Sequence, residues 1–335
     1  MDYRIVKELP KIELHCHLDG SVSVELLQEL AQKDGVAGFD PKSVQTSHDC
    51  TSLKEYLSCF EHILPFLQSA ENLTLATLDV IRQAALENVA YLEIRVAPLL
   101  HQQAGLSLTE VIDAVVLGVE QGRTQYLTKT NLLIIGMRHH THQEHEALLA
   151  DVLASTKESI VGFDFAGDEA AHDTLSIAPS ISVVHQSGLN LTLHAGECGC
   201  YQNVIEAVKL GAKRIGHGIA IKDSEEAMAL CAKEKVLLEM CPTSNLQSKA
   251  IQSLDEFPLR TFFAKQVPFM ISTDNRTVSN TTLTDEYMLL ATHFGLTYRE
   301  MMEINQCAMT YSFADSLTKA TVLAKISQSY QDYLD

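Results

Sequence analysis

The sequence of 335 residues is poor in basic residues: 25 Lys and Arg stand against 43 Asp and Glu, so the formal net charge is −18. Nucleic-acid affinity comes mostly from Lys and Arg that neutralise phosphates, so this charge balance argues against a nucleic-acid partner. The sequence also lacks an apolar run of about 18 residues, which a membrane-spanning helix needs. Its first residues, MDYRIVKELPKIE, are too charged for a secretory signal. We therefore expect a cytoplasmic protein with no membrane partner.

The sequence contains no internal repeat and no linker rich in Pro, Gly or Ser. A chain of this length fits two domains or one large α/β barrel, and the missing linker favours a single domain over residues 1–335. The eight cysteines are scattered and mostly sit in apolar contexts, as is typical of reduced thiols. The one close pair, Cys198 and Cys200, has neither the CxxC nor the zinc-ribbon spacing, so we expect no disulfide or metal site there. No feature of the sequence indicates an oligomeric state.

Eight short runs rich in Ile, Val, Leu and Phe alternate with longer stretches of helical periodicity. This alternation is typical of parallel strands joined by helices, and eight such units predict an α/β fold, the closed TIM (β/α)8 barrel. The predicted strands are 12–17, 89–97, 131–137, 159–166, 190–195, 213–217, 236–241 and 267–273.

Three of the predicted helices begin with the capping-box pattern, in which side chains satisfy free amides of the first turn. The pattern is present at Ser107-x-x-Glu110, Asp223-x-x-Glu226 and Thr297-x-x-Glu300. Residues 281–335 contain helical stretches and no further strand. We expect them to form C-terminal helices that pack outside the barrel.

The segment between the first two predicted strands, residues 18–88, is far longer than an ordinary crossover. Loops that follow barrel strands build the active site, so this helical insertion is a candidate lid. Within it, apolar residues recur at helical spacing on one face. They are Leu53, Tyr56, Leu57, Phe60, Ile63, Leu64 and Leu67. This face either packs on the core as an ordinary helix or forms an apolar wall over a ligand.

Polar residues interrupt the predicted strands repeatedly at their carboxyl ends. The first strand ends with His15 and His17, which the period-2 geometry of a strand places on one face. Later strand ends carry His194 and Glu197, His217, and Asp274. Each residue alone is also explained as a buried polar residue or a helix cap. A barrel, however, brings all its strand ends into one ring, so these side chains are expected to converge.

Three histidines and one carboxylate form a ligand set that suits Zn²⁺, and no thiolate at a strand end competes for the ion. Such an ion lowers the pKa of bound water from about 15.7 to about 7, which predicts metal-assisted hydrolysis. His217 and the free oxygen of Asp274 are candidates to hold that water or take its proton. Glu197, three residues after His194, is the natural proton donor to the atom under attack.

Two other clusters have simpler interpretations. The stretch from Arg138 to His145 carries four histidines, but their spacing matches no zinc motif. We predict a solvated loop that opens a helix, with His139 nearest to a pocket. Glu93 and Arg95 share one face of the second predicted strand, and we predict a buried ion pair between them, with a contact to the substrate as the alternative.

Five motifs follow the predicted strands in order: PKIELHCHLDGS (10–21), FAGDE (165–169), HAGE (194–197), RIGHG (214–218) and STDN (272–275). Together they resemble the adenosine deaminase family of metal-dependent barrel hydrolases. The resemblance implies that His15, His17, His194 and Asp274 bind one Zn²⁺ per chain. It also implies that Glu197 protonates purine N1 while His217 orients the zinc-bound hydroxide that attacks C6. The implied reaction of purine salvage converts adenosine, or 2′-deoxyadenosine, to inosine or deoxyinosine and ammonia.

The same resemblance assigns residues to the substrate, a purine nucleoside. An ionised Asp19, which follows the HCHL motif, would accept a hydrogen bond from a ribose hydroxyl and repel a 5′-phosphate. Gly167 would offer its backbone N–H to purine N3, because it has no side chain to prevent close approach. Asn275 stands where animal-type members have a second Asp, and its amide can donate to purine N7 without a pKa shift.

The resemblance also concerns the lid, and it leaves the exact substrate open. Leu53, Tyr56, Leu57 and Phe60 match the apolar lid helix of the family. An alternative is a deaminase with the same metal site that acts on another 6-aminopurine, such as adenine or a 5′-modified adenosine. A catalytically silent protein that binds a purine or a protein partner is a further alternative, although every chemical position of the motifs is filled.

Overall fold

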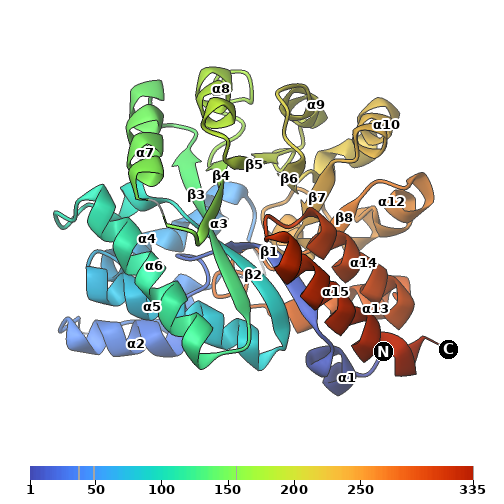
Figure 1. The fold of residues 1–335 in the computed structure, drawn as a ribbon, viewed down its shortest axis with the longest axis horizontal. Helices are drawn as coiled ribbons and strands as arrows, with labels where there is room; N and C mark the ends of the chain where they lie inside the picture. Colours follow the sequence, from blue (N-terminus) through green and yellow to red (C-terminus); the bar gives the residue numbers. More distant parts are fainter. Residues whose placement is uncertain (37, 48–49, 156, 335) are drawn as a thin grey trace.

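The computed structural model describes residues 1–335 except 37, 48–49, 156 and 335. Residues 37 and 48–49 of the predicted insertion and residue 335 of the predicted C-terminal segment therefore lie outside the described residues. Eight parallel strands form one sheet in sequence order, and helices surround it (Figure 1). The strands are β1 (Lys11–His17), β2 (Val89–Val96), β3 (Lys129–Met137), β4 (Ile160–Ala166), β5 (Asn190–Ala195), β6 (Arg214–His217), β7 (Leu237–Met240) and β8 (Phe269–Ile271).

The sheet closes between β1 and the segment that follows β8. The N–H of His17 donates to Asp274 O at 2.8 Å, and the N–H of Asp274 donates to His15 O at 3.0 Å. The predicted (β/α)8 barrel is therefore confirmed. The last strand is shorter than the predicted run 267–273, because Pro268 has no amide hydrogen and Thr273 donates its N–H to the Glu13 carboxylate instead of a strand.

The α-helices lie around the barrel and in the insertion after β1 (Figure 1). They are α1 (Tyr3–Glu8), α2 (Val24–Lys33), α3 (Leu53–Ser58), α4 (Phe60–Ile63), α5 (Ala70–Leu86), α6 (Leu108–Gln125), α7 (His142–Ala154), α8 (Ala178–Ser187), α9 (Tyr201–Lys209), α10 (Glu225–Glu234), α11 (Pro242–Gln247), α12 (Leu259–Lys265), α13 (Leu283–Phe294), α14 (Tyr298–Tyr311) and α15 (Ser316–Tyr330). Across the described residues, none of the helices combines the length and the apolar character that a bilayer crossing requires.

Two of the three predicted capping boxes are present. Ser107 caps α6 and Thr297 caps α14, each with the expected Glu in the reciprocal position. The prediction at Asp223 is wrong by one residue: Ser224 caps α10 and accepts from the N–H of Ala227 at 3.2 Å. Asp223 instead ends a 3₁₀ helix and pairs with Lys222.

The apolar face predicted from Leu53 onward does not form one helix. It is divided into α3, α4 and a 3₁₀ turn at Leu64–Phe66. Pro65 lies in that turn and cannot donate the backbone hydrogen bond that a continuing helix needs. Short elements therefore cover the barrel mouth in place of one long helix.

Charged side chains fill part of the barrel interior, and they pair across strands. Glu93 and Arg95 are fully buried, as predicted, but the predicted pair between them is wrong. Arg95 binds Asp164 at 2.8 Å and Glu239 at 2.6 Å, whereas Glu93 binds Arg214 at 2.6 Å. The physical reason is that residues two apart on a strand are separated by about 7 Å along it, so partners on facing strands lie closer.

Candidate active site

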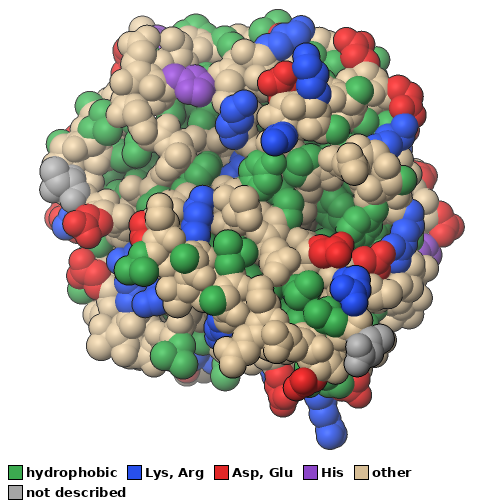
Figure 2. Space-filling model, turned by 45° about the vertical axis from the view of Figure 1, so that its right-hand side comes forward, with side chains coloured by type: hydrophobic (Ala, Val, Ile, Leu, Met, Phe, Trp, Pro, Cys, Tyr) green, Lys and Arg blue, Asp and Glu red, His purple; other side chains and the backbone are tan. Residues whose placement is uncertain are grey.

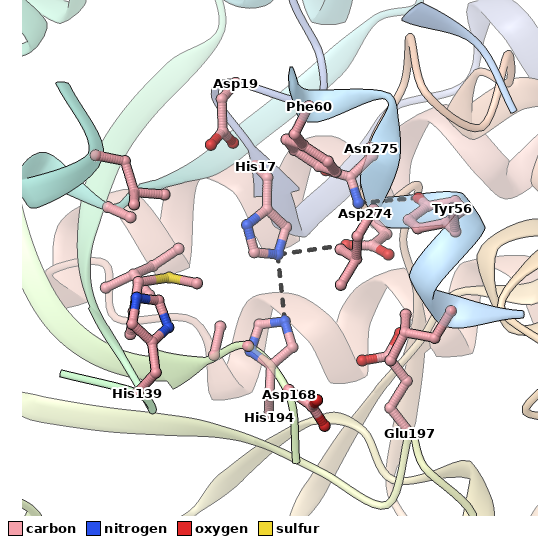
Figure 3. A pocket seen from close by; sticks show the side chains of 18 of the residues that line it. His17, Asp19, Tyr56, Phe60, His139, Asp168, His194, Glu197, Asp274 and Asn275 are labelled. Atoms are coloured by element: carbon pink, nitrogen blue, oxygen red, sulfur yellow. Dashed lines mark hydrogen bonds and ion pairs between the residues drawn. The ribbon is translucent and has the colours of Figure 1, made fainter. Parts of the chain in front are cut away.

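The carboxyl ends of the strands bring five side chains together. His15 and His17 end β1, His194 lies in β5, His217 ends β6, and Asp274 follows β8. Nε2 of His17 lies 3.3 Å from Nε2 of His15 and 3.2 Å from Nε2 of His194. Asp274 Oδ1 lies 3.3 Å from Nε2 of His15 and of His17. Figure 3 shows His17 between Asp274 and His194.

His217 belongs to the same cluster. The potential ligand atoms of His15, His194, His217 and Asp274 all lie within 4.8 Å of one another. The backbone of both His217 and Asp274 has a positive φ, +61° and +64°. Such conformations are uncommon for residues other than glycine and gather at functional sites.

The outer nitrogens of two imidazoles face buried carboxylates. His15 Nδ1 lies 2.9 Å from Glu239 Oε2, and His194 Nδ1 lies 2.9 Å from Asp164 Oδ2. Although burial opposes ionisation, Arg95 and Arg214 hold the pKa of Glu239 well below its usual range. These carboxylates therefore keep the ring protons on Nδ1 and leave the Nε2 lone pairs facing the cluster.

This arrangement fits a bound divalent cation. Burial lowers the pKa of His17 well below its usual range, so the ring is neutral. Burial also opposes the charge on Asp274, but the imidazoles of His15, His217 and His17 around it hold its pKa well below the usual range. Imidazole nitrogens 3.2–3.3 Å apart repel one another when their lone pairs face the same point, unless a positive charge lies among them, and a bound cation supplies that charge. Nitrogen and oxygen donors of this kind suit zinc.

The short helix α11 holds two members of the cluster in place. Ser244 Oγ donates to Asp274 Oδ2 at 2.6 Å, and Asn245 Nδ2 lies 3.1 Å from His217 Nδ1. An amide N–H that donates to Nδ1 leaves the imidazole proton on Nε2. That nitrogen of His217 lies 3.7 Å from Glu197 Oε2.

Glu197 lies in the turn after β5, which the buried Glu169 fixes. The Glu169 carboxylate accepts from the backbone N–H groups of Gly196, Glu197 and Cys198 at 2.6, 3.0 and 3.1 Å. Burial, together with the negative charges of Asp274 and Glu169, raises the pKa of Glu197 well above its usual range. A carboxyl group with a raised pKa keeps its proton to a higher pH than an ordinary Glu does, which suits a general acid.

A cavity of about 330 Å³ lies above the cluster. The cluster residues His17, His194, His217 and Asp274, with Glu197, line its floor, and His15 lies behind them with no exposed surface. The lid residues Leu53, Tyr56, Leu57 and Phe60 form one wall, which supports the interpretation of this face as an apolar cover. Asp19, Gly167 and Asn275 complete the lining among the predicted residues.

The three residues assigned to the substrate all line this cavity, and Figure 3 labels Asp19 and Asn275. Asp19 is 7% exposed, and burial raises its pKa to about 6. Gly167 has φ +112°, and a Cβ there would lie 3.2 Å from Met137 Cε. Asn275 is 4% exposed and donates from Nδ2 to the Tyr56 hydroxyl at 3.0 Å.

The histidine-rich segment differs in part from the predicted solvated loop. His139 is exposed and lines the cavity, and Thr141 caps α7 with Glu144. Arg138 is buried, however, and donates to His194 O at 2.5 Å, while His145 is buried with Nε2 2.9 Å from Met137 O. These side chains pack against the strand ends because the segment follows β3 directly.

Sequence reasoning missed the residues that orient the cluster. Asp164 and Glu239 carried a signal, since a carboxylate inside an apolar barrel strand requires a buried partner. Glu169 lies in one of the quoted motifs and had no assigned role. Ser244 and Asn245 gave no signal, because α11 lies outside the strands.

Comparisons with known proteins agree with this geometry. A family model described as adenosine deaminase matches residues 10–329. An adenosine deaminase of Enterococcus faecalis is 43% identical, and the match covers 98% of this chain and 99% of that protein. The apo structure of the N6-methyl-AMP deaminase from Arabidopsis thaliana is 26% identical with a TM-score of 0.86, covering 98% of each chain.

One further likeness concerns the fold alone. The structure of an amidohydrolase from Burkholderia ambifaria, solved with bound zinc, has a TM-score of 0.90 at 21% identity and covers 99% of this chain and 93% of that one. The family model and the full-length relative carry the assignment: this chain belongs to the adenosine deaminase family.

Proposed function

We propose that this protein catalyses the hydrolytic deamination of adenosine and 2′-deoxyadenosine to inosine or deoxyinosine and ammonia. The observation that carries the proposal is the position of Glu197, with its raised pKa, on the floor of the same cavity as the imidazole and carboxylate cluster. A metal ligand set beside a protonated carboxyl group is what hydrolysis at an amidine carbon requires.

In this proposal one Zn²⁺ per chain is held by His15, His17, His194 and Asp274. The family is metal-dependent, and His17 with the two imidazoles and one carboxylate whose facing atoms lie 3.2–3.3 Å from its Nε2 are donors that suit zinc. When bound, such an ion polarises water and lowers its pKa to about 7. Glu239 and Asp164 would fix the two rings that they contact, as outer-sphere carboxylates do.

The residues of the chain then divide the work at the purine ring. Glu197 donates its proton to N1, which makes C6 more electrophilic. Water attacks C6, forming the C6–O bond. One water proton passes to the amino nitrogen, so that the C6–N bond breaks with release of ammonia, and the other water proton returns to Glu197, which leaves a C6 carbonyl and an N1–H. His217, with its proton on Nε2, would hold the attacking oxygen by a hydrogen bond, and Asp274 would fix its direction.

The cavity lining favours a nucleoside over a nucleotide. No Lys or Arg lines it among the described residues, and Asp19 would repel a 5′-phosphate when ionised. In the proposed pose Asp19 accepts from a ribose hydroxyl, Gly167 donates its N–H to N3, and Asn275 donates to N7. The cytoplasmic location expected from the sequence stays a prediction.

Ammonia release from a panel of adenosine, 2′-deoxyadenosine, adenine and AMP tests the proposal. We expect the two nucleosides to have the highest kcat/KM. Faster turnover of adenine or AMP would instead support the alternative substrates, and no ammonia from any of them would leave a purine-binding protein without this activity.

A further inference from the structure

One residue of the lid has a polar contact that an apolar wall does not need. Tyr56 lies in α3, where its neighbours are exposed, yet only 1% of its own surface is exposed. Its hydroxyl lies 2.9 Å from Ser279 Oγ and 3.0 Å from Asn275 Nδ2. Figure 3 shows the Tyr56 ring reaching from the lid to the Asn275 amide. The lid is thus connected to the barrel through the residue proposed to contact the purine.

The orientation of the Asn275 amide sets the donor and the acceptor in its contact with Tyr56. The amide nitrogen of Asn275 can only donate, so the phenol oxygen of Tyr56 accepts. The single proton of the phenol is then available to Ser279 Oγ. Burial raises the pKa of Tyr56 well above its usual range. The hydroxyl is therefore neutral and can both donate and accept a hydrogen bond.

The other side of the Asn275 amide is restricted by Gly20. A Cβ atom at residue 20 would lie 1.9 Å from Asn275 Oδ1, so the amide oxygen rests directly against the glycine backbone. No described residue gives this buried oxygen a hydrogen-bond partner. Rotation of the amide by 180° would put Nδ2 against the glycine and break the bond to Tyr56.

The orientation leaves one N–H of Asn275 for the ligand. An amide nitrogen carries two protons, and one of them is donated to Tyr56. Asn275 lines the cavity, so its second proton is available to an acceptor on a bound purine. The reversed amide would present an oxygen, which repels a ring-nitrogen lone pair.

We propose that Tyr56 is a specificity-determining residue: its hydroxyl orients Asn275 so that the enzyme selects purines that have a hydrogen-bond acceptor at position 7. The inference rests on the proposed function and deepens it. Without the phenol oxygen, both amide orientations become accessible and the selection for this acceptor weakens. Tyr56 acts here through Asn275, as a positioning residue that also belongs to the lid.

The test compares adenosine with 7-deazaadenosine, in which a C–H replaces N7. The measured quantity is kcat/KM for adenosine divided by kcat/KM for 7-deazaadenosine. It is determined in the wild type, Tyr56→Phe, Asn275→Ala and the double variant. Comparing ratios between variants cancels the intrinsic difference in reactivity of the two substrates. Loss of an oriented buried hydrogen bond costs about 1–3 kcal/mol, so the Tyr56→Phe substitution is expected to lower the ratio by about 5- to 150-fold.

The expected loss falls on adenosine, while kcat/KM for 7-deazaadenosine changes little. In the Asn275→Ala background the Tyr56→Phe change is expected to leave the ratio unaltered. Tyr330→Phe is the matched control. Tyr330 is also a buried tyrosine whose hydroxyl makes a hydrogen bond, to Pro10 O, but it does not line the cavity. Tyr330→Phe is expected to lower stability without changing the ratio.

An equal fall in kcat/KM for both substrates in Tyr56→Phe would overturn the inference and leave a structural role only. If Tyr56→Phe does not fold, Ser279→Ala replaces it, since loss of the Ser279 hydroxyl frees the phenol proton to bond to a reversed Asn275 amide. Ser279→Ala is expected to lower the ratio by less than the fall predicted for Tyr56→Phe. An unchanged ratio would overturn the inference. Absence of adenosine turnover in the wild type would refute the proposed function itself. Failure of the proposed function is thus distinguishable from failure of the inference about Tyr56.

Discussion

At the residue scale, the site combines carboxyl groups in opposite protonation states. Asp274 has a pKa held well below its usual range, and Glu197 has one raised well above it. Burial opposes the charged form of both groups, so the difference comes from their partners: imidazoles and a serine hydroxyl surround Asp274, while Glu197 faces other negative charges. One carboxylate is suited to a metal ion and the other carboxyl group to proton donation.

Glu197→Gln tests the proton donor. The amide has nearly the same shape but cannot transfer a proton, so we expect kcat for adenosine to fall at least about 100-fold. The zinc content and KM are expected to change little, because Glu197 is not a proposed ligand. Glu206→Gln, at a half-buried position in α9 outside the cavity lining, is the control. Turnover near the wild-type rate in Glu197→Gln would refute the assigned role.

Asp19→Ala tests the ribose contact. A hydrogen bond to a charged group contributes about 1.5–3 kcal/mol, so we expect KM for adenosine to rise about 10- to 150-fold. Purine, a competitor without ribose, is expected to keep its inhibition constant. The contact does not exist if KM for adenosine is unchanged, or if both constants shift equally.

At the element scale, β6 passes so close to two imidazoles that only glycine fits. A Cβ at Gly216 would lie 2.9 Å from His15 Cε1 and 3.2 Å from His194 Cγ and Nδ1. Both rings are also held from behind by carboxylates, so they have little room to move. The strand and the outer carboxylates therefore define the ring positions together.

Gly216→Ala is expected to displace His15 and His194 and to weaken zinc binding about 10- to 100-fold, the scale seen when groups that orient metal ligands are lost. Zinc affinity by competition with a chromogenic chelator measures this change. Gly35→Ala is the control: its Cβ meets nothing within 4 Å, but φ there is +68°, so stability falls without an effect on zinc. Equal zinc affinity in Gly216→Ala and the wild type would contradict the proposed packing constraint.

The sequence predicts the strands and their polar ends better than it predicts the side-chain pairing inside the barrel. Strand runs such as 89–97 are recognisable because a barrel strand is apolar on both faces, and all eight residues of β2 are buried. The polar strand ends His194 and Asp274 were recognisable because topology alone places them in one ring. The pairing of Arg95 with Asp164 and Glu239, in contrast, depends on which barrel layer each side chain reaches, and a linear pattern does not contain that information.

At the scale of the whole molecule, helices surround the barrel (Figure 1), and one of the C-terminal helices carries a buried carboxyl group. Glu286 in α13 is fully buried and accepts from Thr243 N at 3.0 Å and Thr281 Oγ1 at 2.6 Å. Burial raises its pKa to about 7 from the model-peptide value of 4.5. The native protein therefore holds this proton at pH values where the unfolded chain has lost it.

The raised pKa makes stability depend on pH. Glu286 contributes fully below pH about 4.5, and the contribution is lost as pH rises through about 7, a change of about 3 kcal/mol in the free energy of unfolding. Glu286→Gln removes this titration, so its stability relative to the wild type is expected to increase between pH 5 and pH 8. Urea unfolding of both proteins at the two pH values measures the difference. Parallel changes in the two proteins would show that Glu286 does not titrate in this range.

The proposed activity depends on one divalent ion among side chains from β1, β5 and the end of β8. The most direct test measures zinc by elemental analysis and ammonia release from adenosine, before chelation, after it, and after zinc is restored. We predict one zinc per chain, loss of turnover on its removal, and recovery when it is returned. Full turnover by the metal-free protein would contradict the account, as would a protein that binds no zinc at these histidines.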